Sequence, residues 1–70
     1  MWVERNARYP RVRSTTWWTR YHLLGRKIAR QGGAATANDR RVAEILAASA
    51  PQGSAADAAV ASMLGVVYGT

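Results

Sequence analysis

The sequence contains no cysteine and no phenylalanine, only one histidine, and only four acidic residues. Without cysteine the chain forms no disulfide, and a cysteine-based metal site is excluded. One histidine and four scattered carboxylates provide neither a catalytic triad nor a cluster of metal ligands. The glycines do not form a phosphate-binding motif such as GxxxxGK[ST] or GxGxxG. We therefore expect no enzymatic activity, no cofactor and no metal.

Long apolar runs are also missing. No stretch approaches the roughly 20 apolar residues that a transmembrane helix needs. Residues 1–5 do not begin an apolar run of the kind found in signal peptides. We therefore expect neither a signal peptide nor a transmembrane helix, and a location in the cytoplasm or inside a virion or another assembled particle.

Positive charge is abundant and lies at one end of the chain. Ten Lys and Arg residues against four Asp and Glu residues give a net charge of +6. Residues 1–35 hold eight cations and one acid, net +7, whereas residues 36–70 hold two cations and three acids, net −1. Such segregation indicates a polyanionic partner for the first half of the chain.

The clearest helical period lies in the middle of this basic half. Trp17, Tyr21, Leu24 and Ile28 follow the spacing that lines one side of a helix, and the opposite side is almost wholly cationic. This pattern predicts an amphipathic helix over about residues 15–31. Its apolar side is wide enough to face a core.

Residues at both ends of this segment fit a helix start and a helix stop. Ser14, Thr15 and Thr16 are candidate N-caps, because each offers a side-chain oxygen to the free N–H groups of a first turn. Gly32 and Gly33 follow the last periodic residue and favour the left-handed conformation that ends a helix.

A second helix is predicted over about residues 39–49. Thr36 and Asp39 have the spacing of a capping box, with Asp in the position usually held by Glu, and Asn38 is an alternative N-cap. Arg40 and Glu44 are an i,i+4 pair on this helix, in the less favourable order. Pro51 disfavours the helical conformation at the residue before it and is expected to end the helix.

A third helix is predicted over about residues 55–68, and it is apolar on nearly every side. Ser54 and Asp57 have the spacing of another capping box. A chain of 70 residues buries about one face of each helix, so the apolar surplus indicates packing against another subunit. The bulky stripe predicted as the oligomer interface comprises Val60, Met63, Leu64 and Val67.

A four-residue turn before the third helix has the length of the turn in DNA-binding helix-turn-helix motifs. The third helix should then enter the major groove, but it has no Arg, Lys, Asn or Gln to read base edges. The standard motif is therefore excluded, and contact with nucleic acid should come from the basic half.

The fold predicted from these observations is all-α and oligomeric. It has an extended basic arm over residues 1–13 and a small helical domain over residues 14–70. Arginine forks onto phosphate in ways that lysine does not, and such contacts carry little sequence information. The residues predicted to bind the polyanion are Arg5, Arg8, Arg11, Arg13, Arg20, Arg26, Lys27 and Arg30.

We predict a small non-enzymatic structural or assembly protein that self-associates and contacts a polyanion, with nucleic acid in a phage, virion or nucleoprotein particle as the first candidate. One alternative is a cationic, membrane-active peptide of the bacteriocin type, because a basic amphipathic helix with Trp also suits a membrane interface. Another is a small regulatory module that binds an acidic protein.

Overall fold

The computed structural model describes residues 14–69, which form three helices and no strand. The helices are α2 (Ser14–Arg30), α3 (Ala37–Ala48) and α4 (Ser54–Tyr68). The all-helical prediction is therefore confirmed for this part of the chain, and the predicted helix boundaries are within two residues of those observed. The predicted basic arm of residues 1–13, with Arg5, Arg8, Arg11 and Arg13, lies outside the described residues.

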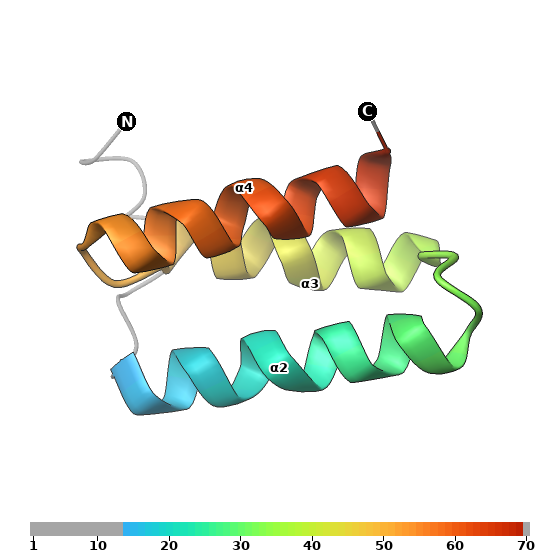
Figure 1. Ribbon diagram of the computed structural model, residues 1–70, viewed down its shortest axis with the longest axis horizontal. Coiled ribbons are helices and arrows are strands. Elements are labelled where there is room, and N and C mark those ends of the chain that lie inside the picture. The colour runs from blue at the N-terminus through green and yellow to red at the C-terminus, as the bar shows by residue number, and fades with distance from the viewer. Residues whose placement is uncertain (1–13, 70) are drawn as a thin grey trace.

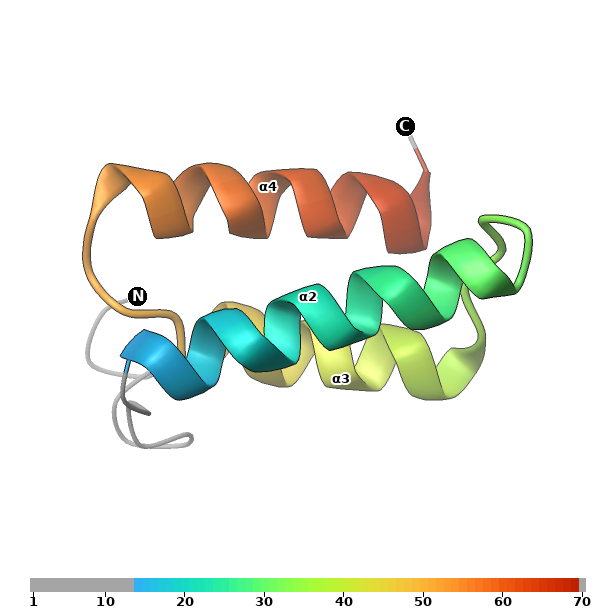
Figure 2. The ribbon, with the colours of Figure 1, turned by 60° about the horizontal axis from the view of Figure 1, so that its bottom comes forward.

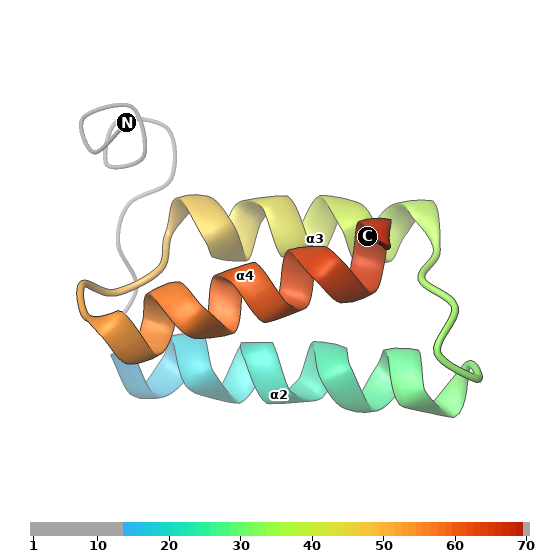
Figure 3. The same ribbon diagram turned by 45° about the horizontal axis from the view of Figure 1, so that its top comes forward.

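The three helices pack as consecutive antiparallel pairs (Figure 1). Contacts between helices are concentrated in the α2–α3 and α3–α4 pairs, whereas α2 and α4 touch only weakly. Figures 2 and 3 show α4 lying across the layer that α2 and α3 form. Helix α3 is therefore the element that connects the other two.

Two glycines end α2 in the way that the sequence predicts. The N–H of Gly33 donates to the carbonyl of Ile28 at 2.9 Å, and the N–H of Gly32 donates to the carbonyl of Ala29 at 3.1 Å. This pair of bonds is the Schellman motif. Gly32 adopts φ +76° and Gly33 φ +88°, which a residue with a Cβ rarely adopts.

The other predicted caps divide into one that is correct and two that are wrong. Thr36 is the N-cap of α3 and forms a capping box with Asp39, as predicted. The predicted box at Ser54 is wrong, because Gly53 is the N-cap of α4 and no side chain caps that helix. The predicted N-caps of the first helix are also wrong, because residues 14–16 lie within the first turn of α2.

Trp17 is the centre of the core. Its side chain is fully buried, and its indole Nε1 donates to the Leu46 carbonyl at 2.8 Å. Leu46 lies in the last turn of α3, where carbonyls lack partners within the helix, so the indole satisfies a group that would otherwise be unpaired. Tyr21 stacks on Trp17 with ring centroids 5.5 Å apart. The bond ties the start of α2 to the end of α3.

Small side chains make up much of the core that receives these aromatic rings. Four alanines are buried, and they allow the helices to approach closely. The buried apolar residues are Trp17, Leu24, Ile28, Ala43, Leu46, Ala50, Ala56, Ala59, Met63 and Val67.

Candidate functional site

The exposed surface of α2 carries three arginines that form no ion pair with the described residues. Arg20, Arg26 and Arg30 are exposed, and α2 contains no acidic residue. Among residues 14–69, no carboxylate lies within 4.0 Å of any of the three guanidinium groups. Arg26 and Arg30 are one turn apart and therefore project from the same side of the helix. We call Arg20, Arg26 and Arg30 the basic face of α2.

Lys27, which the sequence groups with these cations, has a partner within the chain. Its Nζ donates to Asp39 Oδ1 at 2.5 Å, although about half of the Lys27 side chain remains exposed. Lys27 therefore neutralises a carboxylate of the neighbouring helix. The cations of α2 without a carboxylate neighbour among the described residues are the three of the basic face.

Asp39 is a fully buried carboxylate whose oxygens are both bonded. Besides Lys27, it accepts from Gln31 Nε2 at 2.9 Å and from the Thr36 backbone N–H at 2.9 Å. The hydrogen bond from Lys27, then those from Thr36 and Gln31, hold the pKa of Asp39 well below its ordinary value of 3.8, against the opposing effect of burial. This group joins α2, the following loop and α3.

Two further charged residues of α3, Arg40 and Glu44, contact α4. Arg40 Nε donates to the Val67 carbonyl at 3.0 Å, and its guanidinium lies 5.9 Å from the centre of the Tyr68 ring. The Tyr68 hydroxyl donates to Glu44, and this bond raises the pKa of Tyr68. The predicted pair between Arg40 and Glu44 is therefore not formed, because both side chains contact the C-terminal turn of α4 instead.

The stripe predicted as the oligomer interface lies against the core of the single chain. Met63 and Val67 are buried, and Val60 and Leu64 are half-buried against the core. Met63 and Val67 therefore already pack against residues of their own chain. Self-association stays a prediction, and any surface for it must be sought among exposed residues.

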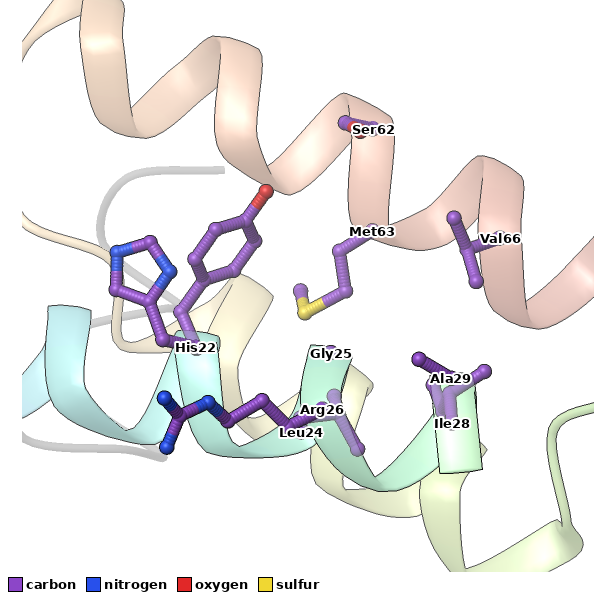
Figure 4. Close-up of a pocket in the computed structure, with 10 residues that line it drawn as sticks. His22, Leu24, Gly25, Arg26, Ile28, Ala29, Ser62, Met63 and Val66 are labelled. Atoms are coloured by element: carbon purple, nitrogen blue, oxygen red, sulfur yellow. The ribbon is translucent and has the colours of Figure 1, made fainter. Parts of the chain in front are cut away.

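An apolar groove lies between α2 and α4, where these two helices touch least. Its volume is about 450 Å³. Figure 4 shows Met63 pointing from α4 toward α2, and Val66 lines the groove further along α4. The groove is lined by Tyr21, His22, Leu24, Gly25, Arg26, Ile28, Ala29, Ser62, Met63 and Val66.

Sequence reasoning did not find this groove, because it arises from the weak contact between two helices that are not neighbours in the chain. One residue gave a usable signal. Gly25 lies in the interior of a predicted helix, where glycine is unfavourable, and such a residue often marks a close approach.

No group of three or more His, Asp or Glu side chains among residues 14–69 is placed to hold a metal ion. None of the three described helices is long and apolar enough to cross a membrane. His22 is exposed, and its ring contacts those of Trp18 and Tyr21.

Comparisons with protein-family models, curated proteins and solved structures find no significant match to this chain. A function for the chain therefore has to be argued from its own residues.

Proposed function

We propose that this chain is a small non-enzymatic structural or assembly protein that binds nucleic acid through the basic face of α2 and associates with further copies of itself. The observation that supports the proposal is that Arg20, Arg26 and Arg30 are exposed, with no carboxylate within 4.0 Å among the described residues. An isolated cationic surface of this kind attracts an anion with several charges.

The placement of the acidic residues strengthens the proposal. Asp39 is occupied by Lys27, and Glu44 accepts from Tyr68 on the far side of α3. Both acids are therefore unavailable to the basic face. Arginine suits phosphate in particular, because its planar guanidinium donates two parallel hydrogen bonds to phosphate oxygens.

The predicted arm would add to the same surface. This arm precedes α2 in the sequence and contains four further arginines, Arg5, Arg8, Arg11 and Arg13. Contacts of this kind neutralise phosphates and fix the position of the protein, whereas sequence is read from base edges. We therefore propose binding that is indifferent to sequence, inside the cytoplasm or an assembled particle.

The salt dependence of duplex binding tests the proposal. Titration of the full chain against short labelled duplexes of two unrelated sequences, followed by fluorescence anisotropy, should give similar affinities that fall steeply with salt. Removing one phosphate contact should lower the slope of log K against log salt by about 1. We expect this reduction for Arg26→Gln and Arg30→Gln.

Arg41→Gln is the matched control, because Arg41 is an exposed arginine of α3 outside the basic face. It should leave the slope close to that of the wild type. Equal losses in all three variants would mean that only total charge matters, and absence of binding at low salt would refute the proposal. Leakage of anionic vesicles without duplex binding would favour the membrane-active alternative.

A further inference from the structure

Gly25 lies in the middle of α2, and the described part of the chain gives no reason for a glycine there. Glycine in a helix interior costs about 0.5–1 kcal/mol relative to alanine. Gly25 is exposed, and a Cβ placed on it would meet no atom of the described residues within 4 Å. Neither packing nor a positive φ explains the residue. With no side chain at this position, the surface of α2 is open here to a close approach by another helix.

Gly25 forms part of the wall of the groove between α2 and α4. Ala29, one turn further along α2, extends the same small-residue wall, and Ser62 and Val66 form the α4 wall. Val66 lines the groove and is 52% exposed. The walls thus present glycine, alanine and an exposed valine above an apolar floor.

The charge of this surface restricts what can cover it. Helix α4 has no charged residue after Asp57, and the charge among the residues that line the groove is that of Arg26 on α2. Copies of a chain with net charge +6 repel one another through most of their surface. They can approach through a surface without like charges, and the exposed side of α4 is such a surface.

We propose that the groove between α2 and α4 receives α4 of a second copy of this chain, with Val66 of each copy packed against Gly25 and Ala29 of the other. The contact would be self-complementary, as in a two-fold dimer. Small residues on both walls allow the helix axes to come within about 8 Å, the short end of the usual range. The inference rests on the assembly part of the proposed function and assigns it a surface.

The test uses the full chain without nucleic acid, in high salt, by sedimentation velocity over a range of concentrations. The wild type should form dimers or larger species. Gly25→Gln should fold at least as stably as the wild type at low concentration, since Gln is a better helix former and has open space, yet its association should weaken about tenfold or more. Val66→Asp should also weaken association, because it places a carboxylate in an apolar contact.

Leu23→Asp is the matched control for Val66→Asp. Leu23 is 53% exposed but lies outside the α2–α4 groove, so its replacement should leave association unchanged. Each variant should also be melted at low concentration by circular dichroism, to show that the free chain still folds. The comparison then separates loss of the contact from loss of the fold.

Three results would overturn the proposal. The first is a wild type that stays monomeric at every concentration, and the second is unchanged association of Gly25→Gln. The third is a Gly25→Gln chain that melts well below the wild type, which would show that the groove is filled from within the same chain. Duplex binding by a monomeric wild type would support nucleic-acid binding by the basic face and refute the interface proposed here. Association without duplex binding would support the interface and refute nucleic-acid binding by the basic face.

Discussion

Asp39 is the residue on which the junction of α2 and α3 depends most. It is 0% exposed, and its carboxylate accepts from Lys27, Gln31 and the Thr36 backbone. A buried carboxylate is costly unless it is bonded, and here both oxygens have donors. The ion pair with Lys27 and the hydrogen bonds to the carboxylate therefore stabilise the fold only while Asp39 is ionised.

This dependence predicts a loss of stability in acid. Because the pKa of Asp39 is lowered on folding, the folded chain binds fewer protons than the unfolded chain, and its stability rises with pH. The contribution should be complete above about pH 5 and should decline progressively as the pH falls below the ordinary pKa of a carboxyl group toward the lowered pKa of the folded state. Thermal melts between neutral pH and pH 2, followed by circular dichroism, measure it.

Asp39→Asn should be less stable than the wild type at neutral pH and should show a flatter decline in acid. Asp57→Asn is the control, because Asp57 is an exposed carboxylate that forms no ion pair with the described residues. A parallel decline of wild type and Asp39→Asn would assign the acid sensitivity to another group.

At the scale of the helix, the end of α2 shows how one backbone conformation sets a boundary. Gly32 at φ +76° turns the chain out of the helix and lets two N–H groups bond the last carbonyls. A residue with a Cβ pays about 1–2 kcal/mol for this left-handed conformation.

Two glycine-to-alanine changes in the same helix should therefore have opposite effects. Gly32→Ala should lower the free energy of unfolding by about 1 kcal/mol. Gly25→Ala should raise it by about 0.5–1 kcal/mol, because this glycine is inside the helix with open space for a Cβ. For a domain of this size, 1 kcal/mol corresponds to about 4–8 °C in melting temperature. If both variants melt lower, something covers Gly25 in the free chain.

The helices themselves could be predicted because their signals are local. The period of apolar residues, the two glycines after α2 and the box of Thr36 and Asp39 all act within a few residues. The N-cap of α4 was assigned to Ser54 and not to Gly53, because Ser followed three residues later by Asp is the sequence signature of a capping box. The bonds of Asp39 to Lys27 and Gln31 cross a loop, and no local pattern encodes them.

At the scale of the whole molecule, the single chain buries more of the apolar surface of α4 than the sequence interpretation expected. Ala43 on α3 and Ala56 and Ala59 on α4 are buried, and their small size lets α4 bring Met63 and Val67 into the core. The sequence interpretation instead assigned this stripe to a second subunit. Which side of an apolar helix faces inward depends on the helices that pack around it, and the residues of that helix alone do not determine it.

The unbalanced charge of the molecule predicts that salt stabilises the free chain. Arg26, Lys27 and Arg30 lie within about one turn of α2, and like charges at that spacing cost a few tenths of a kcal/mol per pair. Screening should reduce this repulsion, so the melting temperature should rise by a few degrees between low and moderate salt.

Sodium chloride titrations followed by circular dichroism measure this effect at a low protein concentration. Salt also weakens the ion pair of Lys27 and Asp39, but that pair is partly buried and is screened less. A melting temperature that falls as salt is added would mean that the ion pair outweighs the repulsion.

Helix α3 contacts both other helices, while α2 and α4 hardly touch each other. Neighbours in the chain are thus neighbours in space, and little of the chain has to be brought together over a long loop before contacts form. Such a topology favours rapid folding through either hairpin. During synthesis, α2 and α3 can dock as soon as both have left the ribosome, and α4 then completes a structure that is already half assembled.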